Sequence, residues 1–198
     1  MNVTVFPTGY TKLASMRSTE PIHTGFAPVY RADAGVLVLG SMPGIASLQA
    51  GRYYAHPRNA FWLIMDELCG AGPGMPYAQR LQCLRDGGIA LWDVLQQCRR
   101  RGSLDSNIRH QDLQVNDFAA LLQQCPSLEC ICFNGGKAAQ LFQRLALPTL
   151  RQHAQLAPRL HDMVLQRMPS TSPAYAAMPL AQKLITWQQL IGPHLQRR

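Results

Sequence analysis

The residues that could carry chemistry lie in four short segments, and each segment directly follows an apolar run. The segments are 41–59, Asp93 with the arginines after it, 134–136 and 168–173. They offer backbone N–H groups, hydroxyls, two asparagines, one aspartate and two tyrosines, which suit a flat polar group and phosphates. They contain no Ser-His-Asp set at a recognisable spacing, no paired carboxylates, and neither a P-loop nor a dinucleotide fingerprint. The sequence therefore predicts a site that holds a polar, phosphate-bearing ligand without a metal.

Four apolar runs predict the strands that must position these segments. The runs are 35–40, 88–92, 128–133 and 163–168, and the last is the least apolar, so we place it at an edge of the sheet. The apolar residues of the first run are consecutive rather than alternating, which is typical of a parallel strand covered on both faces. Because parallel strands end at one edge of their sheet, the four polar segments should meet there.

Helical patterns alternate with the strands, which favours an α/β fold. The predicted helices are 60–69, 78–86, 113–124, 137–145 and 179 to about 191, with a loop over 148–160. We expect a three-layer α/β/α sandwich with a central four-stranded parallel sheet. No repeat, linker or low-complexity stretch divides the chain, so we expect a single domain over 1–198 whose residues 1–30 form an irregular arm.

The charge of the chain favours an anionic partner. The 198 residues carry a formal net charge of +8, with 16 arginines against 3 lysines, and the planar guanidinium suits phosphate. Nucleic acid is the commonest such partner, although many small basic proteins have none. No apolar run approaches the roughly 18 residues of a membrane span, and no signal-peptide pattern opens the chain. We therefore expect no membrane association, a cytoplasmic location and a monomer.

The six cysteines do not indicate a metal site. No Cys-x-x-Cys pair and no Cys/His cluster with zinc spacing occurs. We expect six reduced and mostly buried thiols, with Cys130 and Cys132 on opposite faces of a strand. The prediction is a protein with no metal and no cofactor.

Two of the polar segments resemble motifs of the uracil-DNA glycosylase superfamily. The run 40–44, Gly-Ser-Met-Pro-Gly, is similar to the first motif, and 168–174, Met-Pro-Ser-Thr-Ser-Pro-Ala, is similar to the second. The run 54–62, Tyr-Ala-His-Pro-Arg-Asn-Ala-Phe-Trp, resembles the hypoxanthine-DNA glycosylase branch and its mismatch-specific relatives. The resemblance extends from about residue 28 to 191. It implies a monofunctional enzyme that cuts the bond between a deaminated base and deoxyribose, with DNA carrying such bases as partner.

The resemblance implies roles for individual residues. Tyr54 falls where the family stacks an aromatic ring on the flipped base, and Asn59 falls at the essential asparagine, which we expect to orient the attacking water. Backbone N–H groups after Ser41 would stabilise charge on the leaving base. Asp93 would accept the N1–H of hypoxanthine, in a protonated form if burial keeps it neutral. Asn134 is a further candidate at the base.

Two departures from the family pattern separate this chain from classical uracil enzymes. Met42, which we place among the base-binding residues, replaces the water-activating Asp or Asn, and Met168 replaces the second-motif His. Both favour the hypoxanthine branch. Which base is preferred, hypoxanthine, uracil or xanthine, stays open.

The expected contacts to DNA lie outside the base pocket. The candidate residues for phosphate are Arg58, Arg99, Arg100, Arg101, Ser170, Thr171 and Ser172. Tyr175 or Pro173 is expected to fill the gap left by the flipped base.

Structural alternatives stand beside these assignments. Asn59 suits the N-cap of the helix that follows, Asp93 suits a cap, and Asn134 suits a turn. His56 is expected to be a structural hydrogen-bonding group, and an arginine run is commonly a solvated face. Two other functions are a hydrolase or transferase acting on free nucleosides and a nucleic-acid-binding module without catalysis.

Overall fold

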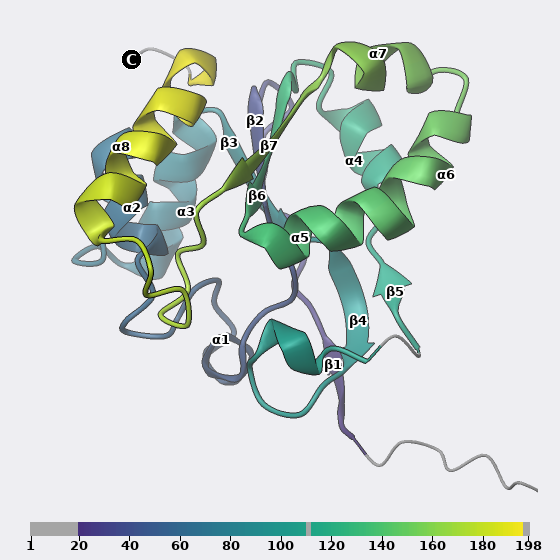
Figure 1. Cartoon of the computed structure of the whole chain (residues 1–198). Coiled ribbons are helices and arrows are strands. Elements are labelled where there is room, and N and C mark those ends of the chain that lie inside the picture. The colour runs from purple at the N-terminus through teal and green to yellow at the C-terminus, as the bar shows by residue number, and fades with distance from the viewer. Residues whose placement is uncertain (1–19, 110–111, 196–198) are drawn as a thin grey trace, which may run out of the picture.

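A computed structural model describes residues 20–109 and 112–195 (Figure 1). Most of the predicted irregular arm, residues 1–19, lies outside this range. Within it, residues 20–30 are less irregular than predicted, because Ile22–Thr24 forms strand β1 and Val29 bridges to Leu91.

The main sheet is the predicted one. Its strands run in the order β3 (Ile89–Asp93), β2 (Val36–Gly40), β6 (Cys130–Asn134) and β7 (Val164–Met168), and all neighbours are parallel. Strand β7 lies at an edge, as its weaker apolar character predicted. Residues 36–39 are completely buried because helices cover both faces of β2. The three-layer α/β/α prediction is confirmed.

One helical layer comprises α2, α3 and α8, and the other comprises α4 to α7, as Figure 1 shows. The first layer spans Phe61–Cys69, Tyr77–Asp86 and Leu180–Ile191. Trp187 is fully buried, and its ring packs edge to face with Phe61, with the ring centroids 6.4 Å apart. The second spans Phe118–Gln124, Gly136–Leu141, Leu147–Gln152 and Ala157–Asp162, with a π-helical turn at Phe142–Ala146. A 3-10 turn, η3 (Gly192–His194), directly follows α8.

Two helical predictions need correction. The expected loop 148–160 contains α6 and α7, because its two prolines occupy the first turns of these helices, where no intrahelical N–H is lost. The expected helix 113–124 begins only at Phe118. Asp117 accepts a hydrogen bond from Ala120 N at 3.0 Å and caps it there, and the residues before it form strand β5 (Gln114–Val115).

A second sheet was missed by the sequence prediction. Strand β4 (Leu95–Arg99) pairs antiparallel with β1 on one side and β5 on the other. The chain leaves the main sheet at Asp93, enters β4, and then turns through a 3-10 turn, η1 (Asp105–Asn107). This excursion brings residues 103–105 to the carboxyl edge of the main sheet, beside the short helix α1 (Ile45–Ala50), where Ser103 Oγ accepts from Ile45 N at 2.9 Å.

The expectation for Cys130 and Cys132 was wrong. Side chains two residues apart on a strand share a face, and the two sulfur atoms lie 3.5 Å apart. All six cysteines are free thiols, and five of them are buried.

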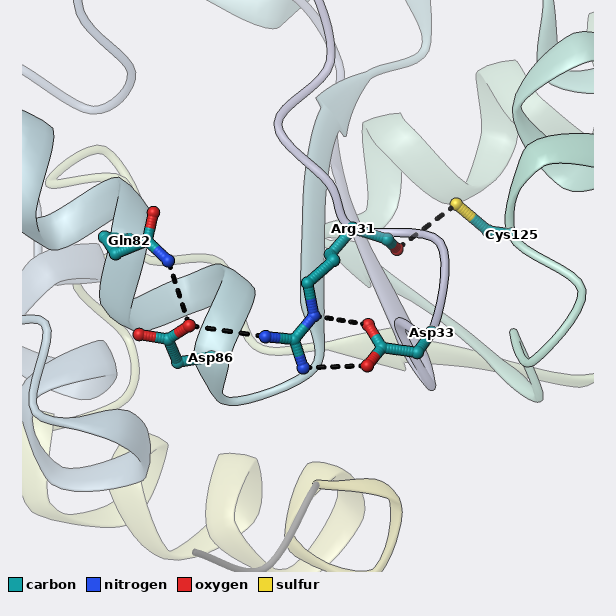
Figure 2. A network of polar contacts seen from close by, with 5 residues as sticks. All are labelled: Arg31, Asp33, Gln82, Asp86 and Cys125. Carbon is teal, nitrogen blue, oxygen red and sulfur yellow. Dashed lines mark hydrogen bonds and ion pairs between the residues drawn. The ribbon is translucent and has the colours of Figure 1, made fainter.

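A polar network ties segments together at the amino edge of the main sheet (Figure 2). Arg31 binds both carboxylate oxygens of Asp33, at 2.5 and 2.8 Å, and approaches Asp86 at 3.3 Å. Gln82 Nε2 donates to the same Asp86 at 2.9 Å, and Cys125 Sγ contacts Arg31 O at 3.6 Å. These residues precede strands β2, β3 and β6, so the network joins the entry points of three strands.

Among the helices that the structure describes, none has the length and apolar character that would let it cross a membrane.

Candidate active site

A cavity of about 310 Å³ lies at the carboxyl edge of the main sheet. All four predicted polar segments reach it, as the parallel topology required. A fifth segment, 103–105, which the sequence did not place there, also lines it. The lining residues used below are Ser41, Met42, Tyr54, His56, Asn59, Asp93, Asp105, Asn134, Ser170, Thr171, Ser172 and Tyr175.

Tyr54 forms a rigid aromatic wall of the cavity. Its ring stacks on Phe61, with centroids 3.9 Å apart and planes inclined by 19°. Its hydroxyl receives a hydrogen bond from Asn134 Nδ2 at 3.0 Å. Its backbone has φ of +51°, a left-handed conformation that is unfavourable for a bulky residue. Such strain is typical of functional loops, and here it accompanies a ring fixed on one face and at its hydroxyl.

Asn134 lines the cavity and ties two of its loops together. Both amide hydrogens are used, one on Tyr54 and one on Thr171 Oγ1 at 2.8 Å, and Oδ1 accepts from Thr171 N at 2.9 Å. These bonds support the structural alternative, and a contact with the base stays a prediction. The next residue, Gly135, has φ of +99°, and a Cβ there would meet Ser170 Cβ at 3.0 Å. The turn therefore needs glycine to let the two loops approach.

Asp93 is a buried carboxyl group with few hydrogen-bond partners. Only 4% of the residue is exposed, and Oδ2 has no hydrogen-bond partner in the described structure. A Cβ at Gly40 would collide with Asp93 Oδ1, so the glycine of the first motif makes room for this carboxyl. Burial, followed by repulsion from Asp105, raises the pKa of Asp93 to about 8, with Arg100 opposing the shift. At neutral pH the group is therefore mainly the neutral acid.

Asn59 lies just before helix α2 and also faces the cavity. The N-cap position is Ala60, so the predicted cap was one residue off, but Asn59 Oδ1 accepts from Phe61 N at 3.0 Å and so holds the first N–H of the helix. The amide hydrogens on Nδ2 have no partner among the described residues, which leaves them for a ligand. His56 has a structural bond, because its Nδ1 accepts from Arg58 N at 3.2 Å.

Asp105 is a second carboxylate in the cavity, and the sequence prediction missed it. Ser41 Oγ donates to Asp105 Oδ1 at 2.6 Å, and Arg100 Nη1 lies 3.9 Å from the same oxygen. Its side chain is 44% exposed, in contrast to Asp93. The prediction that the site has no paired carboxylates was therefore wrong. The signal that could have found Asp105 was a hairpin turn after residue 99, which would return the chain to the sheet edge.

The four arginines predicted to contact phosphate differ in their surroundings. Arg100 is completely buried and donates to Pro43 O, so its assignment as a DNA contact is contradicted. Arg99 is paired with Asp112 at 2.7 Å and donates to Glu20 O. Arg58 and Arg101 are exposed beside segments that line the cavity, and neither side chain has a hydrogen-bond partner among residues 20–109 and 112–195.

The second-motif loop is held both by bonds to other segments, such as those from Ala60 N to Thr171 O and from Trp187 Nε1 to Pro169 O, and by internal bonds. Thr171 is 1% exposed, which contradicts its assignment as a phosphate contact. Ser170 Oγ accepts from Ser172 N, and Ser172 Oγ accepts from Ala174 N, although both residues remain partly exposed. Tyr175 is 37% exposed, and its ring lies 5.1 Å from Lys183 Nζ.

Metal ligands do not cluster in the part of the chain that the structure describes. No group of three or more His, Cys, Asp or Glu side chains could hold an ion there.

Met42, which is 5% exposed, places a thioether at the cavity wall, at the position where the family pattern of classical uracil enzymes has the water-activating Asp or Asn.

Comparison with known families gives one match over most of the chain. Residues 27–191 match the model of the uracil DNA glycosylase superfamily. This span includes every residue that lines the cavity.

Similar proteins are found in two Methanosarcina species. A protein named hypoxanthine DNA glycosylase from Methanosarcina barkeri is 36% identical over 117 residues, which cover 59% of this chain and 73% of that protein. One of the same name from Methanosarcina acetivorans is 38% identical over 120 residues, covering 60% and 75%. The solution NMR structure of a Methanosarcina acetivorans protein, provisionally named a uracil DNA glycosylase, aligns with a TM-score of 0.66 at 30% identity over 86% of this chain and 99% of that one.

Proposed function

This chain belongs to the uracil DNA glycosylase superfamily, and from that premise we propose that it is a monofunctional DNA glycosylase whose preferred substrate base is hypoxanthine. The enzyme flips the deaminated nucleotide out of the duplex and hydrolyses its N-glycosidic bond. The observation that carries the proposal is that Tyr54, Asp93 and Asn59 line one cavity, although 39 positions separate the first from the second.

Asp93 supplies the base recognition. A neutral carboxyl offers a donor and an acceptor side by side. Hypoxanthine presents the complementary pair, the N1–H donor beside the O6 acceptor, and uracil and xanthine carry the same adjacent N–H and C=O. The flipped base stacks on the face of Tyr54 that Phe61 does not cover, a contact worth about 1–3 kcal/mol. A neutral acid also avoids the repulsion that a carboxylate would exert on a departing base anion.

Asn59 supplies the position of the water. Its oxygen is engaged by Phe61 N, so its Nδ2 hydrogens hold the water oxygen, or the sugar, in place. Because the bond breaks through an oxocarbenium-like state, positioning and electrostatics account for much of the acceleration. Backbone N–H groups after Ser41 face the leaving base.

The assay that tests this function separates it from the two alternatives. Duplexes carrying inosine, uracil or xanthine are incubated with the protein, and abasic sites are cleaved with alkali. We expect scission with inosine. Binding without scission on any duplex would favour a silent module, and activity confined to free nucleosides would favour a nucleoside hydrolase.

Variants of Asn59 sharpen the assay. Asn59→Asp keeps an oxygen that accepts from Phe61 N but loses the amide hydrogens, so we expect a folded protein with excision reduced about 100-fold or more. Gln140→Ala removes an exposed amide on α5 and should leave excision unchanged. Equal rates in Asn59→Asp and wild type would contradict the role.

We also propose that the chain acts in the cytoplasm, as a monomer and as one domain over 1–198. The charge balance and the absence of a dividing linker in the sequence support this part of the proposal.

A further inference from the structure

Asp105 has a built environment that the proposed reaction does not yet use. It lines the cavity, receives the Ser41 hydroxyl hydrogen at 2.6 Å, and lies 3.9 Å from a fully buried guanidinium. Arg100 has two buried groups, Nε and Nη1, without a hydrogen-bond partner in the described structure. Burying the Arg100 guanidinium without all its hydrogen bonds costs free energy of folding. Its charge is best explained by the Asp105 carboxylate that it faces.

The cavity needs a proton acceptor that the other candidates do not provide. An amide is not a base, and the Asn59 oxygen is already engaged by Phe61 N. Met42 offers only a thioether, which is a weak acceptor. The Nδ1 of His56 is engaged by Arg58 N. Among the described residues, Asp93 and Asp105 are the two carboxyl groups of the cavity, and Asp93 is assigned to the base.

Exposure places the two carboxyl groups at different depths. Asp93 is 4% exposed at the closed end, whereas the Asp105 side chain is 44% exposed. A flipped nucleotide inserts its base first, and its sugar stays near the mouth because the phosphodiester chain remains outside. Leu104, which is 55% exposed, marks the same rim. Asp105 therefore lies at the level of the sugar and is open to water.

We propose that Asp105 is a catalytic carboxylate that accepts the proton of the attacking water and faces the positive charge that develops on the sugar. The proposal rests on the glycosylase function proposed above and adds a residue to it. In this role Asp105, which comes from a different loop, takes over the function of the first-motif acid whose position Met42 occupies. Ser41 and Arg100 act through Asp105 and are positioning residues.

The protons and electrons of the step balance. The N-glycosidic bond breaks and its electron pair leaves with the base, which receives the proton of neutral Asp93. The water oxygen bonds to C1′ of deoxyribose, and the proton that it loses passes to ionised Asp105. The products are the free base and an abasic site. Exchange of one proton from Asp105 to Asp93 through solvent restores both groups, and no cofactor is consumed.

The groups around the two acids differ in how strongly they oppose protonation. Those interacting with Asp105 are Ser41, Asp93, Arg100, Lys137, Tyr54 and Cys98. Burial raises the pKa of Asp105 above its ordinary value, but the Ser41 hydroxyl, Arg100 and Lys137 oppose the shift. Asp93 has only Arg100 in opposition. Two neighbouring acids held in different environments are the usual arrangement for a base and an acid at one pH.

The test is single-turnover excision of hypoxanthine from an inosine duplex across a range of pH. Wild type should lose rate as pH falls, because Asp105 becomes protonated. Asp105→Asn should excise hypoxanthine about 100-fold more slowly, or more slowly still. It should bind the duplex at least as tightly as wild type, and its rate should show no acid limb. Asp162→Asn, an exposed aspartate at the end of α7, is the matched control and should behave as wild type.

A second variant keeps the proposal falsifiable if Asp105→Asn does not fold. Ser41→Ala removes a donor that stabilises the carboxylate, so its acid limb should move to higher pH. Asp105→Asn with a rate within threefold of wild type, or a Ser41→Ala acid limb that does not move, overturns the role of Asp105. Wild type that excises no deaminated base overturns the proposed function instead, so the two failures are distinct.

Discussion

The two edges of the main sheet both collect polar side chains, but in opposite states. At the amino edge, Arg31, Asp33 and Asp86 form ion pairs whose side chains are 42–51% exposed. At the carboxyl edge, Asp93 is 4% exposed and Oδ2 has no partner. The ion pairs at the amino edge thus have partners and lie in solvent, whereas the carboxyl edge of the same strands holds a buried carboxyl oxygen without a hydrogen-bond partner in the described structure.

The difference teaches where to look for chemistry in an α/β protein. Exposed ion pairs contribute little because water screens them and their side chains lose freedom on pairing. A buried polar atom without a partner costs free energy and persists where a ligand completes it. Variants at the carboxyl edge should therefore have large effects on excision, and variants at the amino edge small ones.

The largest effect is expected at Asp93. Asp93→Ala removes both the donor and the acceptor that meet the base, so excision of hypoxanthine should fall about 100-fold or more. Asp93→Asn keeps one donor and one acceptor but has no proton to transfer to the base, so its rate should lie between those of Asp93→Ala and wild type. Single-turnover rates on inosine, uracil and xanthine duplexes check this, and an Ala variant with unchanged binding and base preference would refute the role.

Tyr54 should follow. Tyr54→Ala removes a stacking surface worth about 1–3 kcal/mol, which corresponds to a roughly 5- to 150-fold lower rate of excision at subsaturating protein. Tyr54→Phe keeps the ring and loses only the bond from Asn134, so a change of about threefold or less is expected. Similar losses in both variants would show that the hydroxyl, and not the ring face, is what matters.

The pH dependence of excision gives the next effect. Asp93 acts as the neutral acid and its pKa is about 8, so the rate should decline above that pH by up to about tenfold per pH unit. Asp93→Asn cannot ionise and should lose this alkaline limb. An identical limb in both proteins would assign it to another group.

The same titration predicts a change in stability. The folded-state pKa of Asp93 lies above the unfolded value of about 3.9, so the unfolded chain binds fewer protons between the two values. The free energy of unfolding should therefore fall as pH rises from about 4 to about 8. Urea unfolding should show a steeper decline for wild type than for Asp93→Asn, which at pH 7 should be more stable by on the order of 2 kcal/mol.

Phosphate contacts should have smaller effects. Arg58→Ala and Arg101→Ala should each weaken duplex binding a few-fold and reduce the slope of log affinity against log salt by about 1. Arg151→Ala, an exposed arginine on α6 that does not line the cavity, is the control. Unchanged salt dependence in both variants would place the DNA path elsewhere.

The smallest effect is expected at the amino edge. Asp86→Asn weakens an exposed network, so the free energy of unfolding should change by less than about 1 kcal/mol and excision should not change. A loss of excision in this variant would break the comparison, because it would couple the two edges through the sheet.

Particular residues show why the sequence prediction succeeded in part. Consecutive apolar residues at 36–39 predict a buried parallel strand, and the polar segment after it must then lie at the carboxyl edge. Pro148 and Pro158 misled the helix prediction because a proline is equally compatible with a loop and with a first helical turn. Strand β4 was missed because the pattern Leu-Gln-Gln-Cys-Arg has weak alternation and its partners are distant or very short.

The main sheet, the four polar segments and their meeting point follow from the sequence, because hydrophobic periodicity and parallel topology are local patterns with a fixed geometric consequence. Which polar groups remain available depends on tertiary contacts. Burial removes Arg100 and Thr171 from the DNA surface, Tyr54 and Thr171 take up both amide hydrogens of Asn134, and the β4 excursion brings Asp105 to the cavity. These outcomes depend on which atoms from distant segments come within hydrogen-bond distance, and no spacing along the chain encodes that.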